Sequence, residues 1–169
     1  MVEGVSGKPL APFWLHGGHV RIKGVKMAKS RGNIVYPDDL FFQGYEPYHV
    51  RLFLIYKHYR KSLDFTSEGL DLARGRVDTF RKMASRLQDQ AAGSAGGSDP
   101  EARALADSLV HKFEKSMNND LDVEGAFENL YNTLCFLMKI SAAKKLSGPD
   151  AGIAAKNLQK INQVLKILD

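Results

Sequence analysis

Two lysines in a short polar segment are the residues whose types and spacing most directly predict chemistry. Lys26 and Lys29 lie three positions apart in Lys26-Met27-Ala28-Lys29-Ser30, beside small residues that let a backbone approach an anion closely. Lysine amines are mobile point charges that bind phosphate oxygens. Such charges stabilise a phosphoryl group during its transfer without covalent chemistry. The segment therefore predicts a phosphate-binding loop; a solvated lysine-rich turn is the plainer alternative.

The distribution of charge points to the same part of the chain. The 169 residues carry a net charge of +5. Residues 1–65 hold 10 Lys/Arg against 5 Asp/Glu, whereas residues 66–169 hold 14 of each. A basic first part favours an anionic partner such as a nucleotide or a nucleic acid. A basic face that only keeps the protein in solution would produce the same count.

The histidines and the single cysteine predict no metal centre. His16 and His19 lie near a glycine pair and could contact a metal or a phosphate, or only pack or face solvent. His49 and His58 lie nine positions apart on one predicted helix, so they project from opposite sides and share no site. Cys135 excludes an intrachain disulfide and a site with several cysteine ligands, and it is predicted to be a small core residue.

Composition and hydropathy argue against a membrane protein. Hydrophobic residues make up 44% and charged residues 25%, as in ordinary globular domains. No run approaches the roughly 18 apolar residues that a membrane span requires. The first ten residues contain no apolar core of signal-peptide length. We therefore expect a cytoplasmic protein.

The first part of the chain should form a small mixed unit around the lysine segment. A strand or hairpin is predicted over residues 20–25, with a turn at Lys23-Gly24, followed by a loop over 26–36. Residues 37–44 predict a short helix. Pro47 suits the first turn of a helix through about residue 58, which is apolar on most sides and so should be buried.

The rest of the chain should be helical. Residues 67–91 predict an amphipathic helix, capped by Thr66 or Ser67, with a heptad stripe of Leu70, Ala73, Val77, Phe80, Ala84 and Leu87. Residues 91–98 read as a flexible Gly/Ser linker. Asp99 and Asp122 should cap two further helices, the second ending at Gly148-Pro149. A last helix, marked by Ile153 to Leu168, should run to Asp169.

The lysine segment and its flanks resemble a known family. Residues 26–33 (KMAKSRGN), here called the signature loop, are similar to the K-M-S-K-S loop of class I aminoacyl-tRNA synthetases. Residues 14–19 (WLHGGH), 58–66 (HYRKSLDFT) and 113–122 (FEKSMNNDLD) resemble the cysteinyl-tRNA synthetase branch. These blocks follow in order, and the resemblance covers about residues 4–140.

The resemblance implies a reaction and roles for the loop residues. In this family the loop closes over ATP, which binds with magnesium, while cysteine attacks the α-phosphate. Cysteine then passes from the adenylate to the terminal ribose of its tRNA. By position, Lys29 is the catalytic lysine that reaches the triphosphate. Lys26, Met27, Ala28 and Ser30 complete the ATP contact, with Met27 anchoring the loop in a pocket. Ala28 replaces the usual serine and removes one hydroxyl donor, a loss of about 1 kcal/mol.

The resemblance also implies contacts with tRNA. It places Arg51, Arg60 and Lys61 near the acceptor stem. A second group of cations follows the helix predicted over 67–91, with Asp71 and Asp78 among them. We predict that this group is a solvated face rather than a tRNA surface; its members are Arg74, Arg76, Arg81, Lys82 and Arg86.

Two family features are not found in the sequence. The nucleotide-binding catalytic fold should precede the signature loop, and the zinc site that selects the cysteine thiol uses two cysteines, a histidine and a glutamate from that earlier part. We therefore expect no metal site here and a C-terminal piece of a longer enzyme. Its partners would be ATP, tRNA and an N-terminal catalytic domain, and alone it would be inactive.

The sequence thus predicts a mainly α-helical chain without the catalytic nucleotide-binding fold. Residues 1–90 would form a small α/β stem-contact module that carries the signature loop. Residues 99–169 would form a helical bundle similar to the family's anticodon-side (DALR-like) domain. The predicted function is that of the C-terminal region of a cysteine–tRNA ligase. Two alternatives stay open: a non-catalytic tRNA- or RNA-binding paralogue, and part of a related ligase that joins cysteine to a small-molecule amine.

Overall fold

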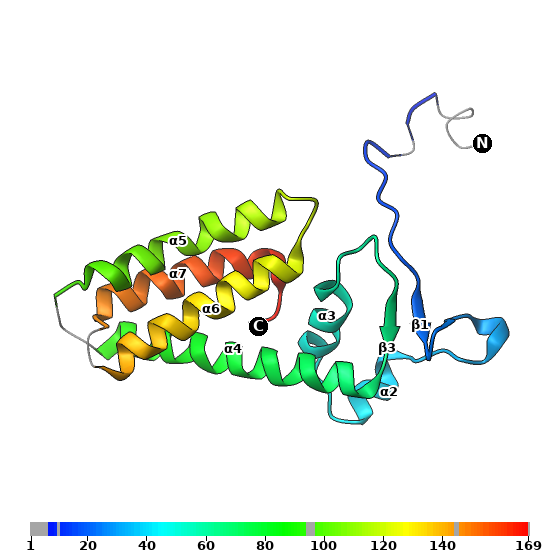
Figure 1. The fold of residues 1–169 in the computed structure, drawn as a ribbon, viewed down its shortest axis with the longest axis horizontal. Helices are drawn as coiled ribbons and strands as arrows, with labels where there is room; N and C mark the ends of the chain where they lie inside the picture. Colours follow the sequence, from blue (N-terminus) through cyan, green and yellow to red (C-terminus); the bar gives the residue numbers. More distant parts are fainter. Residues whose placement is uncertain (1–6, 10, 94–96, 144–145, 169) are drawn as a thin grey trace.

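The structure is mainly helical, with one small sheet at the end of a helical bundle (Figure 1), which confirms the predicted fold class. A computed structural model describes residues 7–9, 11–93, 97–143 and 146–168. The elements in chain order are β1 (Val20–Ile22), β2 (Val25–Lys26), the 3-10 turn η1 (Lys29–Arg31), α2 (Pro37–Phe42), α3 (Pro47–Tyr56), β3 (Leu63–Phe65), α4 (Ser67–Gly93), α5 (Pro100–Met117), α6 (Val123–Ala142) and α7 (Gly148–Leu165).

The sheet has three short strands in the order β2-β1-β3. β1 and β2 form the predicted hairpin, whose turn residues Lys23 and Gly24 have φ of 51° and 76°. Two successive positive φ values are what a type I′ hairpin turn requires. β3 pairs in parallel with β1, Val20 opposite Leu63. β3 was not predicted, because three residues with an exposed Asp64 at the centre are too few to show a strand pattern.

A small apolar cluster holds the sheet end together. Its buried members are Leu40 of α2, Val50 and Phe53 of α3, and Leu70 of α4. Both short helices lie where they were predicted. However, α3 ends at Tyr56 rather than near His58, and Leu54 is 49% exposed, so α3 is buried on one side only.

Helix α4 belongs to both parts of the molecule. Its predicted stripe is confirmed, because Leu70, Val77, Phe80 and Leu87 have at most 1% of their surface exposed. Leu70 packs into the small cluster at the sheet, whereas the other three pack into the bundle core with α5, α6 and α7. Figure 1 shows α4 running from the sheet along the whole length of the bundle.

The helix starts in the bundle follow the capping rules. The carboxylate of Asp99 accepts the N–H groups of Glu101 and Ala102, and that of Asp122 accepts the N–H of Gly125, as predicted. The prediction that Gly148-Pro149 ends a helix is wrong. α6 already ends at Ala142, and Gly148 begins α7, because the hydroxyl of Ser147 caps this start. Proline at the second position needs no N–H partner there.

The last helix also ends earlier than predicted. α7 stops at Leu165, and Lys166 follows with φ 54°, in the left-handed region. The side-chain oxygen of Asn162 then accepts the N–H groups of Ile167 and Leu168, both at 2.9 Å. This amide oxygen therefore satisfies the N–H groups of the two residues that follow the left-handed turn.

The predicted linker over residues 91–98 is only partly visible. Residues 91–93 are the last turn of α4, residues 97–98 precede α5, and residues 94–96 lie outside the described part. Within the described ranges, the structure has no helix both long enough and apolar enough to cross a membrane.

A buried carboxylate joins the starts of α5 and α7. Asp150, in the first turn of α7, is fully buried. It accepts the hydroxyls of Ser147 and Ser98, both at 2.7 Å, and the N–H of Asp99 at 3.0 Å. Burial raises the pKa of Asp150, but these three hydrogen bonds outweigh it and leave the pKa below the usual value of 3.8.

We predict that Asp150→Ala lowers the free energy of unfolding at pH 7 by about 3 kcal/mol, since the substitution orphans three donors. Because the folded pKa is lowered, this contribution is complete above pH 3.8 and is lost as the pH falls through the folded value. Urea unfolding at several pH values measures both effects. The control is Asp107→Ala, which removes an exposed pair with Arg103 and should change stability by less than about 0.5 kcal/mol. Equal effects of the two variants would contradict the assignment.

Candidate functional site

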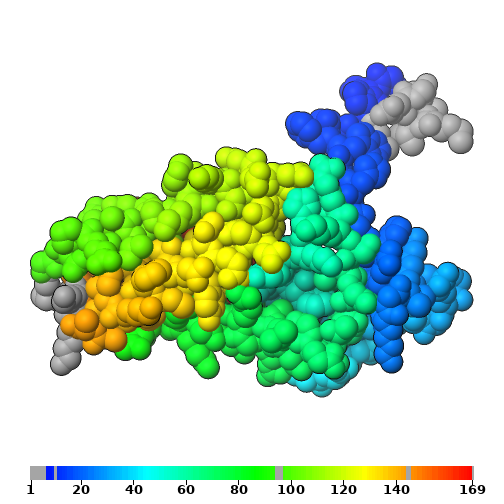
Figure 2. Space-filling view, in the orientation of Figure 1, coloured from blue at the N-terminus to red at the C-terminus, as the bar shows by residue number. Residues whose placement is uncertain are grey.

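The signature loop projects from the end of the molecule farthest from the bundle. Figure 2 shows it, with the β1–β2 hairpin, as a protrusion at one end of the surface. It begins where β2 ends, and the N–H of Met27 donates to the carbonyl of Val20 at 3.0 Å. The 3-10 turn η1 follows, and Gly32, with φ 63°, reverses the chain. The N–H of Gly32 donates to the carbonyl of Lys29 at 3.1 Å, which closes the turn.

The side chain of Asn33 holds the loop in this shape. Its Oδ1 accepts the N–H of Ala28 at 2.9 Å, and its Nδ2 donates to the carbonyl of Lys26 at 3.2 Å. One amide thus fixes the main chain on both sides of Met27. Asn33 was part of the motif resemblance but had no predicted role. An asparagine directly after a left-handed glycine is a signal for such local bonding to the backbone.

Met27 and the two lysines differ in exposure. Met27 is half-buried and lines an apolar pocket of about 290 Å³ with residues of β1, α2 and α3, among them Val20, Leu40 and Val50. Lys26 and Lys29 are exposed. In the described part of the chain neither amine has an acidic partner. The methionine therefore attaches the loop to the body while both charges remain available to an anion.

The two remaining loop positions contribute differently to anion binding. Ser30 is exposed, so its hydroxyl can donate to a ligand. Ala28 has no hydroxyl, and its N–H already bonds to Asn33. Position 28 thus offers no free donor to a ligand.

The histidines do not form a site together. His49 is buried: its Nδ1 accepts the N–H of Glu46 at 2.9 Å, and its Nε2 lies 2.8 Å from a carboxylate oxygen of Asp78 in α4. That geometry makes His49 a structural link between α3 and α4. His16 and His19 are exposed. Among the described residues, no group of three His, Cys, Asp or Glu side chains is placed to bind a metal.

Cys135 packs in the helical bundle. It lies half-buried on α6, and its sulfur is 4.0 Å from that of Met83 on α4. The structure therefore gives the single cysteine a packing role between these two helices.

Two of the three predicted tRNA residues make contacts within the chain. Arg51 donates from Nε to the carbonyl of Leu165 at 2.5 Å and from Nη2 to that of Val164 at 3.1 Å, and so binds the C-terminal end of α7. Arg60 pairs with Asp120, its Nε 2.9 Å from the carboxylate. The third, Lys61, is exposed.

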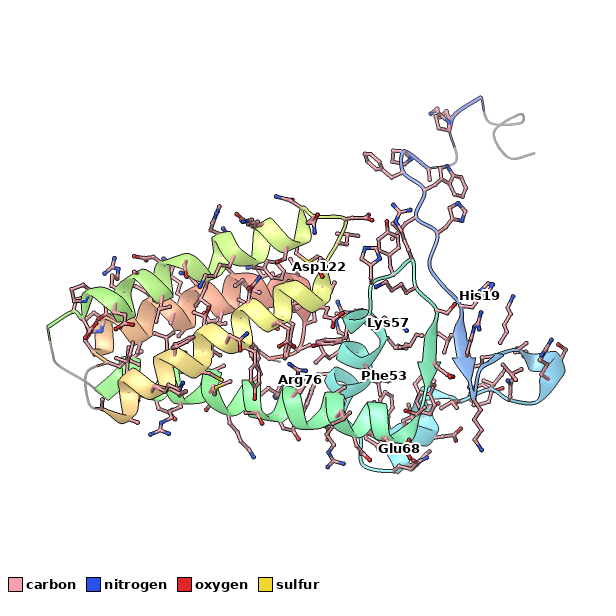
Figure 3. All side chains as sticks on the ribbon, viewed as in Figure 1. His19, Phe53, Lys57, Glu68, Arg76 and Asp122 are labelled. Atoms are coloured by element: carbon pink, nitrogen blue, oxygen red, sulfur yellow. The ribbon has the colours of Figure 1, made fainter. Side chains whose placement is uncertain are left out.

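The predicted solvated face of α4 is correct for Lys82 and Arg86, which are exposed, but wrong for Arg76 and Arg81. Arg76 pairs with Glu128 of α6 and lies over the ring of Tyr56, 5.4 Å from its centroid. Arg81 lies 4.0 Å from the ring centroid of Tyr48 and donates to a carbonyl near the C-terminus. Figure 3 shows Arg76 pointing from α4 toward α3 and α6. These arginines join helices, a use that spacing along α4 did not reveal.

The chain is similar in sequence to known aminoacyl-tRNA synthetases. Residues 1–75 match the sequence model of the family described as "tRNA synthetases class I (C) catalytic domain". The chain is 33% identical, over 98% of its length, to the cysteine–tRNA ligase of Chlamydia muridarum, 36% of which it covers. It is 33% identical to the same enzyme of Chlamydia pneumoniae, with 98% of the chain and 35% of that relative covered, and 29% identical to that of Koribacter versatilis, with 99% and 33% covered.

The chain is homologous to cysteine–tRNA ligases. It spans about a third of the length of these ligases. The family match over residues 1–75 contains β1, β2, β3 and the signature loop, whereas α5, α6 and α7 lie beyond it. The loop that the residues alone marked as phosphate-binding therefore lies in sequence similar to the catalytic domain of these ligases.

We predict that Asn33→Ala loosens the signature loop without unfolding the protein. The N–H of Ala28 loses its acceptor, so its hydrogen exchange should accelerate about tenfold, as expected for a hydrogen bond of about 1.4 kcal/mol. Asn33→Asp keeps the acceptor and loses only the donor, so exchange at Ala28 should change much less. Asn132→Ala, an exposed position on α6, is the control. Unchanged exchange at Ala28 in Asn33→Ala would contradict the clamp.

Proposed function

We propose that this chain supplies the ATP-phosphate-binding loop and tRNA-contacting helices of a cysteine–tRNA ligase. One observation carries the proposal: Lys26 and Lys29 are exposed, without an acidic partner in the described structure, on a loop that Asn33 and Met27 hold in shape. The homology to cysteine–tRNA ligases over nearly the whole chain supports it.

The chemistry proposed for the loop is electrostatic. In the adenylation step, a carboxylate oxygen of cysteine forms a bond to the α-phosphorus of ATP, and the bond to the pyrophosphate oxygen breaks. Negative charge moves onto the departing pyrophosphate. The amine of Lys29, with Lys26 beside it in sequence, is placed to neutralise that charge as it develops. The amino acid then passes to the terminal ribose of tRNA.

Zinc has no role in this part of the proposal. The described residues lack a group of three suitable ligands, and Cys135 packs against Met83 in the bundle. Any metal-dependent selection of the cysteine thiol would have to use residues outside this structure. The magnesium ion would accompany ATP as the counter-ion of its phosphates.

The proposed tRNA contact falls on the segment after α3. Lys61 is exposed there, and Arg60, although paired with Asp120, keeps much of its surface exposed. Arg51 would contribute less, since its guanidinium already binds two carbonyls of α7. A role in translation would place the protein in the cytoplasm.

We predict that the chain alone shows no cysteine-dependent ATP–pyrophosphate exchange. In the described part of the chain, the pocket beside the signature loop is lined by Met27 and other apolar side chains, none of which can hydrogen-bond a cysteine or an adenine. The cysteine–tRNA ligase of Chlamydia muridarum, assayed in parallel, is the positive control. Cysteine-dependent exchange by the isolated chain would overturn this part of the proposal.

In a ligase that carries this chain, Lys29→Ala should lower the adenylation rate about 100-fold, because the amine acts on charge that develops in the transition state. The KM for ATP should change less than about threefold. Rapid-quench measurement of adenylate formation separates the two quantities. Lys115→Ala, which removes an equal charge from the exposed surface of α5, is the control. An unchanged rate would remove Lys29 from the mechanism.

A further inference from the structure

A single segment connects the helical bundle to the signature loop. Residues 57–62, here called the bridging segment, run from the end of α3 to the start of β3. Their side chains contact the turn between α5 and α6, and their backbone contacts the residues that lead into β1.

On the bundle side, three side chains converge on the carboxylate of Asp120. The hydroxyl of Tyr59 donates to it at 2.7 Å, and Arg60 donates from Nε at 2.9 Å and from Nη2 at 3.2 Å. Nε2 of His58 lies 3.5 Å away. The ring of Tyr59 is stacked on that of His58, with 4.9 Å between centroids, and its centroid lies 5.0 Å from the guanidinium carbon of Arg60.

The backbone of the α5–α6 turn presents Asp120 in an uncommon conformation. Asp120 and Leu121 have φ of 51° and 56°, both in the left-handed region. Residues with a Cβ adopt that region at a cost of about 1–2 kcal/mol, with Asp and Asn the best tolerated after glycine. The turn stays ordered because the N–H of Leu121 bonds to Met117 and that of Asp122 to Ser116. The hydrogen bonds from Tyr59 and Arg60 favour this same conformation.

On the sheet side, the bridging segment holds the start of β1 through its backbone. The carbonyl of Tyr59 accepts the N–H of Gly18 at 2.5 Å. A Cβ at Gly18 would lie 2.3 Å from the carbonyl oxygen of Lys61, so only glycine permits this approach. The N–H of Leu63 then donates to the carbonyl of His19 at 3.0 Å, and the pairing of β1 with β3 begins.

Hydrogen bonds continue from β1 to the signature loop. The carbonyl of Val20 accepts the N–H of Met27, the residue on whose two sides Asn33 binds the main chain. Asp64 of β3 accepts the N–H of Gly24 at 3.0 and 3.2 Å, which holds the hairpin turn against β3. A connected series of bonds therefore runs from Asp120 through the bridging segment and β1 to the loop.

We infer that Asp120 is a positioning residue for the signature loop. By fixing Tyr59 and Arg60, it fixes the bridging segment, which in turn sets the place of β1 and of Met27. This inference rests on the proposed function only where it assumes that the loop binds ATP. The series of hydrogen bonds from Asp120 to the loop does not depend on that assumption. Because Asp120 pairs with Arg60, a displacement of the α5–α6 turn would move the bridging segment and, through it, the signature loop. No ligand needs to contact the loop for this to happen.

The test uses the whole chain and amide hydrogen exchange measured by NMR. Asp120→Asn keeps a residue that tolerates positive φ and removes the charge. Exchange should accelerate about threefold or more at Gly18 and Met27, relative to Leu130 in the core of α6 as an internal reference. Tyr59→Phe, which removes only the hydroxyl, should act in the same direction. Asp107→Asn, at an exposed carboxylate paired with Arg103, is the matched control and should leave both amides unchanged.

A charge exchange separates positioning from a general loss of stability. Arg60→Asp combined with Asp120→Arg re-forms the pair in reverse, and Lys23 and Lys166 show that long basic residues adopt positive φ in this chain. The double variant should restore exchange at Met27 toward the wild-type rate, whereas each single variant should not. Acceleration at Gly18 without acceleration at Met27, or equal acceleration at Leu130, would overturn the inference.

A second measurement keeps this inference distinct from the proposed function. In a ligase that carries the chain, Asp120→Asn should lower the adenylation rate and leave the KM for ATP unchanged within about twofold. A loop that moves in the exchange experiment while the adenylation rate is unchanged would uphold the link and count against the catalytic role of the loop.

Discussion

The continuous apolar stripe of α4 is the interaction on which the rest of the structure depends. With 27 residues, α4 is about 40 Å long, and it contributes buried side chains to both apolar clusters, as the much shorter α3 does. Leu70 lies in the sheet-end cluster, whereas Val77, Phe80 and Leu87 lie in the bundle core. Each such buried side chain contributes about 2 kcal/mol. The sheet end has too few buried residues for a core of its own, so the order of the signature loop depends on α4.

Polar contacts fix how the other helices sit on that stripe. Glu128 of α6 accepts both the hydroxyl of Tyr56 from α3 and the guanidinium of Arg76 from α4, so one carboxylate joins three helices. Burial, with the hydrogen bond to Glu128, raises the pKa of Tyr56, which keeps this hydroxyl a donor. Apolar packing alone would allow the helices to slide along one another. Bonds between specific atoms select one arrangement.

The sequence predicted what depends on periodicity and local capping. The α4 stripe repeats at steps of three and four, and Asp99 and Asp122 precede their helices with the short polar side chains that caps require. Strand β3 was not predicted because it pairs with β1 through residues 43 positions apart, Val20 and Leu63. A local sequence pattern contains no information on such a distant pairing. The prediction at Gly148-Pro149 is wrong because this pair is typical of a helix end, whereas Ser147 before it caps the start of α7.

The candidate site also has residues that the sequence predicted and contacts that only the structure shows. The sequence alone predicted Lys26 and Lys29 as phosphate-binding residues, because two lysines three positions apart can be recognised without knowledge of the fold. The clamp by Asn33 depends on a reversal at Gly32 that brings position 33 back to position 28, and the partner of Arg60 is 60 residues away at Asp120. Exposed cations looked interchangeable in the sequence. The structure separates those bound within the fold, such as Arg51 and Arg76, from those left to solvent.

The electrostatics of the signature-loop hairpin follow from that separation. Between positions 21 and 31 the chain has five cations and no acidic residue, all five side chains exposed: Arg21, Lys23, Lys26, Lys29 and Arg31. Like charges at such density repel one another over the Debye length of about 8 Å.

Ion pairs would relieve this repulsion but would also neutralise the charge. Apart from the Asp64 carboxylate, which accepts the N–H of Gly24, the described contacts that hold the hairpin are uncharged: the left-handed turn, the amide of Asn33 and the half-buried thioether of Met27. A hairpin stabilised in this way keeps its positive potential, and a polyanion that binds there removes the repulsion as it docks. Order without neutralisation is the physical condition for a phosphate-binding loop, and it explains why an uncharged residue, Asn33, clamps the most basic stretch of the chain.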